Sequence, residues 1–425
     1  MRTALTRTRQ EGFSELVFGK NDLHPTTYYA DGRIINLPHN EKLIFDGIIT
    51  KYAGKEAEYF KRLFKENGIR DLIEEAQEWD GAWSIVYINQ NGAVYCFTDP
   101  LGKKQLYYNT KGEISSSITF LAAPVVDEFY KSEVGKWGYN TDDRTPWENV
   151  KRIMPNRVYM FLGSHLQHVE TEPYFDFRWG SSKLDADGFR MLVHNSVKEY
   201  LKGLPAGTKS IGVLISGGID SSIIATELLK LRSEDLTLNF YTINNVDDAP
   251  FVKLFAEMHG LKVKTLSYDM DNVDIKNAMD INETPVDLGS MVPNQLMFAA
   301  IPEKVIFTGD GPDELFGGYR RIDEYDSQKS DVFQELSFYH LPRLERAASH
   351  FGIDLRCPWL SYDIIRYALS LPYPERMHKA PLKEAYKDEL PEEIIQRPKL
   401  PLKNDKLRAD PIKYRHELIR LFFDL

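Results

Sequence analysis

The sequence contains little cysteine and no long apolar run. Its 425 residues include two cysteines, Cys96 and Cys357, which lie far apart and form no CxxC pair. A disulfide framework or a thiolate zinc site is therefore not expected, and a reducing compartment is the default. No apolar run reaches the length of a membrane span, and the basic start of the chain lacks the apolar core of a signal peptide. We expect a cytoplasmic protein with no membrane partner.

Basic residues do not dominate the composition. The chain has 53 lysines and arginines against 63 aspartates and glutamates, which gives a formal net charge of −10. Proteins that bind nucleic acids broadly need a basic surface to neutralise phosphates, so no nucleic-acid partner is expected. The hydrophobic content of 42% and the charged content of 27% are typical of globular proteins. The length allows two or more domains.

The most informative stretch covers residues 210–222. Its apolar, β-branched start predicts a buried strand, and the sequence SGGIDS at residues 216–221 follows directly. The pattern then predicts a helix over residues 221–232. Strand, glycine turn and helix N-terminus together favour anion binding, but no lysine follows the glycines as it would in a P-loop. The alternative is an ordinary turn in which Asp220 or Ser221 caps the helix.

Predicted strands alternate with predicted helices in this part of the chain. Strands are expected over residues 236–243, 261–266 and 304–308, with helical patterns over residues 185–201 and 250–259 and from Val273. This alternation predicts a parallel sheet with right-handed crossovers. Ligands bind beyond the carboxyl ends of such strands. Ser216, Ile243 and Gly309 all follow strand ends, so we expect their loops to meet.

A second motif, TGDGPDELFGGY, occupies residues 308–319. Its three acids, Asp310, Asp313 and Glu314, are costly to cluster unless a cation or a proton transfer requires them. Asp220 and Asp313, from two different loops, are predicted to hold Mg²⁺ on a polyphosphate. The alternative is a solvated turn with acids at a helix start.

These two motifs carry a resemblance to a known family. Residues 216–221 resemble the pyrophosphate loop of the ATP pyrophosphatase superfamily. Residues 308–319 resemble the signature of asparagine synthetase B and its relatives, which include β-lactam synthetase. Further matches follow in order and extend the resemblance over residues 185–405: they cover residues 247–251, 283–293, 344–346, 352–360, 379–383 and 397–399.

The resemblance implies an enzyme that uses ATP and Mg²⁺. A substrate carboxylate attacks the α-phosphorus, and ammonia or an amine then attacks the acyl-adenylate. The implied nucleotide contacts are Ser216, Gly217, Gly218, Asp220 and Ser221 for the pyrophosphate and its metal, and Leu214, Ile243, Thr308 and Gly309 for the adenosine.

The resemblance also implies catalytic residues. Lys379 is predicted to stabilise the α-phosphate and the tetrahedral oxyanion, and the alternative is a solvated helix lysine. Asp310 stands where asparagine synthetase has the glutamate that deprotonates the amine and where β-lactam synthetase has tyrosine. Asp354 replaces another family glutamate and is counted with the catalytic residues. Arg356 is predicted to be structural.

The sequence up to about residue 175 predicts short β-strands separated by turns. Strands over residues 83–88 and 93–97 flank the turn signal Asn91-Gly92, and helices are expected over residues 56–66 and 71–77. Residues 99–108 resemble a turn of the glutaminase domain in class II amidotransferases, an N-terminal-nucleophile fold of stacked sheets.

The glutaminase resemblance is degenerate. The family's nucleophilic cysteine at position 2 is Arg2 here, its Asn-Gly-Glu pattern is Asp46-Gly47-Ile48, and its substrate-binding arginine is Thr98. Cys96 lies within a predicted strand and is interpreted as a small core residue. We therefore expect no release of ammonia from glutamine.

The resulting prediction is an α/β protein with two domains. Residues 1–175 would form a degenerate glutaminase-like domain of stacked sheets, and residues 176–425 an ATP-pyrophosphatase-type parallel α/β domain. The predicted activity is amide formation from ATP, a small carboxylic acid, with aspartate the leading case, and ammonia or an amine. The alternatives are an intramolecular amide former of the β-lactam synthetase type and a catalytically silent nucleotide-binding scaffold. Residues 411–423 are expected to form a terminal helix packed on the core, with a homodimer contact as the alternative.

Overall fold

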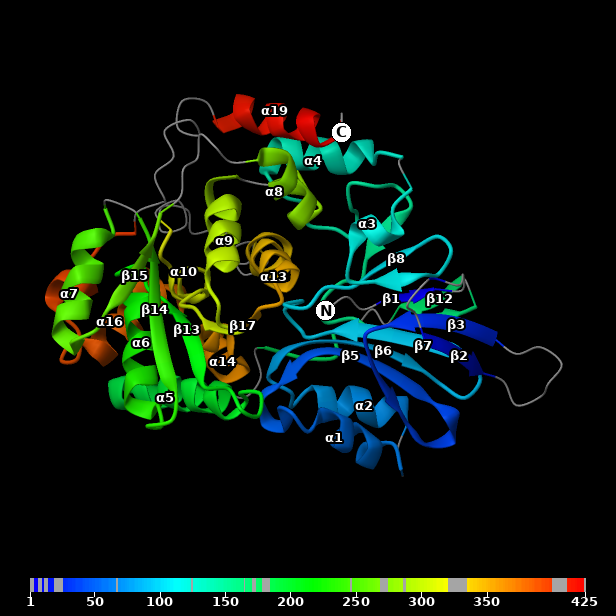
Figure 1. Ribbon diagram of the computed structural model, residues 1–425, viewed down its shortest axis with the longest axis horizontal. Coiled ribbons are helices and arrows are strands. Elements are labelled where there is room, and N and C mark those ends of the chain that lie inside the picture. The colour runs from blue at the N-terminus through cyan, green and yellow to red at the C-terminus, as the bar shows by residue number, and fades with distance from the viewer. Residues whose placement is uncertain are drawn as a thin grey trace.

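The computed structural model describes residues 4–6, 10, 14–18, 26–65, 68–123, 125–163, 165–169, 173–177, 184–244, 247–267, 274–285, 288–319, 335–399 and 411–423. Within these residues, three β-sheets are flanked by helices (Figure 1). Two six-stranded antiparallel sheets come from residues 4–169, and one five-stranded parallel sheet comes from residues 210–356. The predicted α/β class is confirmed. No helix among the described residues has both the length and the apolar character needed to cross a membrane.

The two antiparallel sheets have the strand orders β10-β8-β9-β1-β3-β2 and β12-β11-β7-β6-β5-β4. The predicted hairpin at Asn91-Gly92 joins β6 to β7, with Ile88 opposite Val94. The first sheet comprises β1 (Ala4–Thr6), β2 (Ser14–Phe18), β3 (Thr26–Asp31), β8 (Tyr107–Asn109), β9 (Ile114–Ser115) and β10 (Val150–Arg152). The second comprises β4 (Arg33–Asn36), β5 (Lys42–Ile49), β6 (Gly81–Ile88), β7 (Ala93–Thr98), β11 (Tyr159–Leu162) and β12 (His165–Val169).

These two sheets pack face to face around one apolar core. Successive side chains of a strand point to opposite faces, so Leu5 of the first sheet meets Ile44, Val86 and Cys96 of the second. The outer face of the second sheet is covered by α1 (Glu56–Leu63) and α2 (Ile69–Ala76), close to the predicted helices. Short helices α3 (Ile118–Leu121) and α4 (Glu128–Trp137) lie on the side of the first sheet.

The parallel sheet has the order β15-β14-β13-β16-β17. Its strands are β13 (Ser210–Leu214), β14 (Thr237–Ile243), β15 (Val263–Leu266), β16 (Val305–Phe307) and β17 (Asp354–Arg356). The chain moves outward from β13 through β14 to β15 and then returns to the other side of β13 as β16. The strand order therefore reverses between β13 and β16, and ligands of open α/β sheets bind at the carboxyl ends of such a pair.

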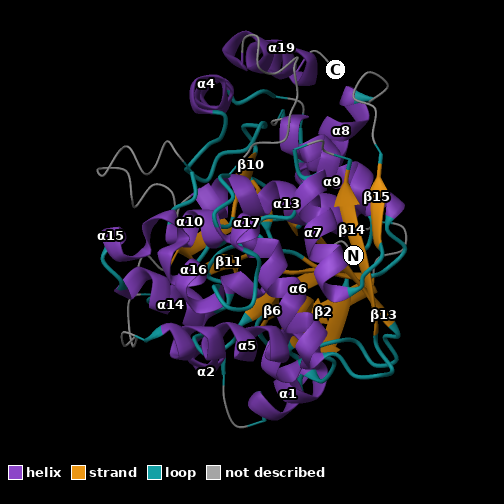
Figure 2. Cartoon of the chain, turned by 90° about the vertical axis from the view of Figure 1, so that its left-hand side faces the viewer, coloured by secondary structure: helices purple, strands orange, loops and turns teal. Residues whose placement is uncertain are grey.

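Helices cover both sides of the parallel sheet. One group consists of α5 (Ala186–Lys202), α6 (Ile219–Leu231) and α16 (Ala380–Tyr386), and α7 (Ala249–His259) follows β14. Figure 2 shows α5, α6 and α16 facing the viewer. A second group, α8 (Ile275–Asn282), α9 (Leu288–Ala300) and α13 (Leu341–His350), lies toward the antiparallel sheets (Figure 1). Shorter helices are α10 (Pro312–Phe316), α14 (Tyr362–Ser370), α15 (Tyr373–Arg376) and α17 (Glu392–Ile395), with a π-helical turn over Leu336–His340 and 3-10 turns over Pro38–Asn40, Thr50–Tyr52, Pro358–Leu360 and Met377–Lys379.

The C-terminal helix α19 (Pro411–Phe423) packs on the rest of the chain, as predicted. Its Leu418 joins Ala278 and Met279 of α8, and its Ile419 joins Tyr130 and Val134 of α4. The helix therefore bridges the two parts of the chain at the top of the molecule (Figure 1). A homodimer stays a prediction.

Two neighbouring lysines connect the antiparallel part to the parallel part. Lys103 is buried and donates hydrogen bonds from Nζ to the carbonyl of Gly81 at 2.8 Å and to the carbonyl of Leu360 at 2.9 Å. Lys104 forms an ion pair with Glu345 of α13. Because buried donors are costly to leave unpaired, these contacts fix the segment around Leu360 against the first part of the chain.

Asp80 belongs to the same junction and gives it a pH dependence. Its Oδ1 accepts from the Gly81 backbone at 2.7 Å and from the Tyr200 hydroxyl at 3.3 Å. Burial raises the pKa of Asp80 to about 6, although the nearby Lys103 ammonium opposes this shift. The folded chain thus binds the proton more tightly than the unfolded chain, so the free energy of unfolding falls as the pH rises from about 4 to about 6.

We expect Asp80→Asn to remove this slope. The amide keeps an acceptor oxygen and carries no charge to desolvate, so the variant should exceed the wild type in unfolding free energy at pH 7 by at most about 3 kcal/mol. The difference should vanish below about pH 4. Denaturant unfolding across this pH range measures it, with exposed Asp235→Asn as the matched control. Parallel pH profiles for Asp80→Asn and the wild type would contradict the assignment.

Candidate active site

The loop after β13 is closed by its own serines. The Ser221 hydroxyl accepts from the Ser216 backbone N–H at 3.2 Å, and the Ser216 hydroxyl accepts from the Gly218 N–H at 3.4 Å. Gly217 has a φ of 69°, and a Cβ there would lie 2.6 Å from the Phe251 Cβ. Only glycine fits this position without displacing α7. The sequence thus builds a tight loop at the N-terminus of α6.

The predicted helix starts earlier than expected, at Ile219, so Asp220 lies in its first turn. No side chain caps this helix at Gly218, which removes the alternative in which Asp220 or Ser221 serves as the cap. Instead, the Asp220 carboxylate contacts Lys379, at the end of the 3-10 turn over Met377–Lys379. The loop after β16 also meets this turn, because a Cβ on Gly309 would lie only 2.6 Å from the Ser221 backbone nitrogen.

Lys379 lies between the two predicted metal-binding acids. Its Nζ is 2.6 Å from Asp220 Oδ2 and 2.5 Å from Asp313 Oδ1. Asp313 comes from α10, directly after β16, so the two loops meet as the sequence predicted. Lys379 is only 7% exposed, which excludes the alternative of a solvated helix lysine. A second lysine, Lys399, places its Nζ 2.6 Å from Asp313 Oδ2.

The charges of this cluster are strongly coupled. Burial opposes the charge of Lys379, but the carboxylates of Asp220 and Asp313 outweigh it and hold the pKa of Lys379 above its usual value. Burial also acts against the charge of Asp313, yet Lys399 and Lys379 hold the pKa of Asp313 well below its usual range. For Asp220, burial dominates and raises the pKa, while Lys379 opposes the shift. Two acids facing two cations leave the cluster close to neutral.

The backbone around the cluster is specialised. Lys379 has a φ of 59° and its neighbour His378 a φ of 55°, a region that non-glycine residues seldom adopt. Gly318 leaves the room that the cluster needs: a Cβ there would lie 1.8 Å from Asp313 Oδ1 and 2.7 Å from Lys379 Cε. The close approach of Lys379 therefore explains the glycine at position 318 of the second motif.

The remaining nucleotide-binding candidates lie at the carboxyl ends of neighbouring strands. Leu214 ends β13, Ile243 ends β14, and Thr308 follows β16. The Thr308 backbone N–H donates to the carbonyl of Arg356 at 3.0 Å. Asp310 also lies in this region, where it accepts a hydrogen bond from the Thr308 hydroxyl. These residues thus share one edge of the sheet with the Ser216–Ser221 loop.

Asp354 is not brought to this edge. It opposes Val305 at the start of β16, whereas the site residues follow the end of that strand. Its carboxylate accepts from Arg356 Nε at 2.9 Å and from Arg356 Nη2 at 2.6 Å. Arg356 also donates to the Gly203 carbonyl at 3.0 Å. The structure therefore places the Asp354 carboxylate in an ion pair with Arg356, away from the other site residues, and its catalytic role stays a prediction.

Three residues of the site had no role assigned from the sequence. Lys399 pairs with Asp313, and Arg397 donates to the Ser216 carbonyl at 2.7 Å and pairs with Asp248. The R-x-K match at residues 397–399 was a signal that could have found both. Trp359 donates from its indole N–H to the Asp220 carbonyl at 3.1 Å. Nothing in the sequence pattern marks that contact.

The acids fit a magnesium ion bound together with phosphates. Asp220 Oδ1 is buried and has no hydrogen-bond partner, so its lone pairs are available. Among the described residues, no group of three or more histidine, cysteine, aspartate or glutamate side chains forms a candidate metal site. Mg²⁺ in nucleotide sites is commonly bound by one or two carboxylates plus phosphate oxygens. The two carboxylates therefore suit a Mg²⁺ ion that binds together with the phosphates of a nucleotide.

Sequence comparisons identify the family of the chain. The family model described as asparagine synthase matches residues 189–337 and 326–420, more than half of the chain. The chain therefore belongs to the asparagine synthase family.

Individual relatives are distant. A probable asparagine synthetase (glutamine-hydrolyzing) of Acanthamoeba polyphaga mimivirus is 23% identical over 372 residues, which are 81% of this chain and 66% of that protein. A putative asparagine synthetase (glutamine-hydrolyzing) of Methanocaldococcus jannaschii is 24% identical over 403 residues, 87% of this chain and 71% of that one. The asparagine synthetase (glutamine-hydrolyzing) of Bos taurus is 28% identical over 242 residues, 49% of this chain and 41% of the relative. The chain thus spans about two thirds of the first two relatives.

Proposed function

We propose that the chain is an ATP-dependent amide ligase that releases AMP and pyrophosphate. It would adenylate a small carboxylic acid and transfer the acyl group to ammonia or an amine. The observation that carries this proposal is the contact of Lys379 with both Asp220 and Asp313, beside the serine-glycine loop and at the point where the strand order reverses. Membership of the asparagine synthase family supports it.

In the first step, a carboxylate oxygen of the acid attacks the α-phosphorus of ATP. A new oxygen–phosphorus bond forms, the bond to the bridging oxygen breaks, and pyrophosphate leaves. The loop over residues 216–221 would bind the departing group through its backbone N–H groups and the positive end of α6. Mg²⁺ held by Asp220 and Asp313 would neutralise phosphate charge. Leu214, Ile243, Thr308 and Gly309 would contact the adenosine.

In the second step, the nitrogen attacks the acyl carbon, AMP leaves, and the nitrogen loses a proton. Lys379 is the residue that we assign to the developing negative charge, because it is buried and its raised pKa keeps it cationic. We assign proton removal to Asp310, whose carboxylate accepts a hydrogen bond from the Thr308 hydroxyl and which precedes α10 in the chain. A carboxylate at this position favours an external nitrogen donor over ring closure.

We also propose that the chain divides into a glutaminase-like domain over residues 1–175 and a ligase domain over residues 176–425. The stacked antiparallel sheets support an N-terminal-nucleophile-like fold for the first, and the strand order of the parallel sheet supports an ATP-pyrophosphatase-type fold for the second. Arg2, which replaces the expected nucleophile, lies outside the described residues.

Several observations support a first domain without glutaminase activity. Cys96 lies in the core between the two sheets, and burial raises the pKa of its thiol, so it is no nucleophile. Asp99 is fully buried and accepts from the backbone N–H groups of Leu101, Lys103 and Lys104 at 3.1–3.2 Å. Its carboxylate thus stabilises the turn through these hydrogen bonds and does not face a substrate.

We expect ammonium, but not glutamine, to support turnover. With ATP, Mg²⁺ and aspartate, ammonium should release pyrophosphate, whereas glutamine should leave the rate at the no-nitrogen background. A coupled pyrophosphate assay, crossing candidate acids with candidate amines, measures both. Glutamate formed from glutamine would contradict the degenerate first domain alone. ATP binding without pyrophosphate release across the whole panel would contradict the ligase and leave a nucleotide-binding scaffold.

A further inference from the structure

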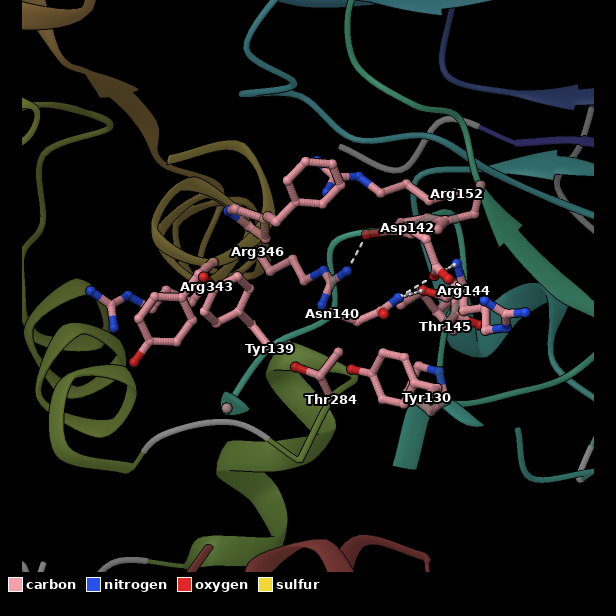
Figure 3. Close-up of a pocket in the computed structure, with 17 residues that line it drawn as sticks. Tyr130, Tyr139, Asn140, Asp142, Arg144, Thr145, Arg152, Thr284, Arg343 and Arg346 are labelled. Carbon is pink, nitrogen blue, oxygen red and sulfur yellow. Dashed lines mark hydrogen bonds and ion pairs between the residues drawn. The ribbon is translucent and has the colours of Figure 1, made fainter. Parts of the chain in front are cut away.

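A pocket lies between the two parts of the chain, away from the nucleotide-binding residues. The first part contributes Tyr107, Tyr139 and Arg152, and the second contributes Phe338 and Arg346, from the π-helical turn and α13 (Figure 3). None of the residues of the 216–221 loop, the 308–319 motif or Lys379 lines it. It is therefore a second concave site, formed only when the two parts are in contact.

Four arginines line this pocket against a single aspartate. Arg144 is neutralised by Asp142 and Asp127, and Arg343 contacts His340 Nδ1 at 2.8 Å. The other two, Arg152 and Arg346, form no ion pair with a carboxylate among the described residues, and only Asp99 and Glu283 act on them from farther away. A buried guanidinium without a counter-ion is costly, so an excess of positive charge inside a pocket needs a reason.

Arg152 is the more deeply buried of this pair. It is 6% exposed, it donates from Nη2 to the Ser337 carbonyl at 2.7 Å, and its Nε has no hydrogen-bond partner. Burial, reinforced by Arg346 and opposed by Tyr107, lowers the pKa of Arg152 to about 10. Arg346 donates to the Asn282 carbonyl at 2.7 Å and to the Tyr107 hydroxyl, and its Nε is likewise unpartnered. Each arginine therefore keeps one buried donor available.

Aromatic rings form the walls around these donors. The Arg152 guanidinium lies 5.1 Å from the centre of the Phe338 ring, and that of Arg346 lies 5.4 Å from the centre of the Tyr107 ring. The rings of Tyr139 and Tyr339 are 5.5 Å apart. Such walls suit a flat apolar body, whereas the guanidinium groups suit a carboxylate, which they bind through paired N–H donors.

We propose that this pocket binds a small organic anion that combines a carboxylate with an aromatic or similarly flat apolar body. The carboxylate would accept from guanidinium N–H groups of Arg152 and Arg346, and the body would lie against the aromatic walls. The site is separate from the proposed ligase chemistry, so either can fail without the other. If the two arginines served only to join the parts of the chain, no anion would bind.

Benzoate is the probe, and benzamide, of the same shape without the charge, is its matched control. Isothermal titration of the full-length protein should show benzoate binding at least about tenfold tighter than either benzamide or inorganic phosphate. Equal binding of benzoate and benzamide would overturn the role of the arginines. Equal binding of benzoate and phosphate would overturn the role of the aromatic walls, and absence of benzoate binding would overturn the proposal.

Substitutions of the pocket arginines test whether benzoate binds in this pocket. Arg152→Gln should weaken benzoate binding by about tenfold or more, because it removes the positive charge and the paired guanidinium donors. Arg366→Gln is the control: Arg366 also has an unpartnered Nε and contacts an aromatic ring, Phe175, but it does not line the pocket. Arg346→Lys, which keeps the charge and loses the planar donor pair, provides a second variant should Arg152→Gln fail to fold. Unchanged benzoate affinity in either pocket variant would overturn the proposal.

Discussion

Replacing Lys379 with methionine is expected to lower ATP-dependent pyrophosphate release by about 10³-fold. Methionine matches the length of the lysine stem, so the packing against Gly318 is largely kept while the charge is lost. The buried ammonium contacts both Asp220 and Asp313, whereas the neighbouring Lys399 forms an ion pair only with Asp313 among the described residues. Steady-state pyrophosphate assays with saturating ATP and ammonium measure the effect.

The control for this experiment is Lys387→Met. Lys387 follows α16, the helix that begins directly after Lys379, but its side chain is exposed and, within the part of the chain that the structure describes, forms an ion pair only with Glu384. Its replacement should leave the rate within about twofold of the wild type, because exposed ion pairs contribute little. A Lys379→Met enzyme that retains a tenth or more of the wild-type rate would contradict the assigned role.

Asp313→Asn is expected to reduce the rate by about 10²-fold or more. The amide preserves the shape of the side chain but loses the charge that holds the pKa of Lys379 and of Lys399 above their usual values. It also weakens one of the two predicted metal ligands, so the Mg²⁺ concentration that gives half-maximal rate should rise. Rates measured across a Mg²⁺ titration separate these two effects.

Asp363→Asn is the matched control for the aspartate variant, since Asp363 is largely exposed and Arg366 is its only ion-pair partner among the described residues. Its Mg²⁺ dependence should equal that of the wild type. If Asp313→Asn kept both its rate and its Mg²⁺ dependence, Asp313 would have no part in metal binding. In that case the site would need a different explanation for the close approach of Lys379.

Much of the site could be predicted because it follows from local pattern and topology. The apolar run before Ser216 and the one before Thr308 marked two parallel strands, and parallel strands end at one edge, so Asp220 and Asp313 had to come close. The tight turn at Gly217 was predicted from the glycine pair in the loop sequence alone. These inferences required only local sequence patterns and the rule that the carboxyl ends of parallel strands meet at one edge of the sheet.

The contacts that the sequence did not predict join distant segments of the chain. Lys379 is 159 residues from Asp220, and nothing local predicts that it inserts between the two acids. The position of Asp354 opposite Val305 and its ion pair with Arg356 could not be predicted either, because both are properties of the folded sheet. The arginine-lined pocket was also missed, because its walls come from residues far apart in the chain.

One chain of contacts links the antiparallel part directly to a proposed metal ligand. Lys103 holds the Leu360 carbonyl, and the adjacent Trp359 holds the Asp220 carbonyl through its indole N–H. A domain that had given up ammonia production would still act as the scaffold beneath the ligase centre. Excising that part would remove the Lys103 hydrogen bond to the Leu360 carbonyl, next to the tryptophan that contacts the Asp220 carbonyl. This contact gives the first part of the chain a structural role that does not depend on its own chemistry.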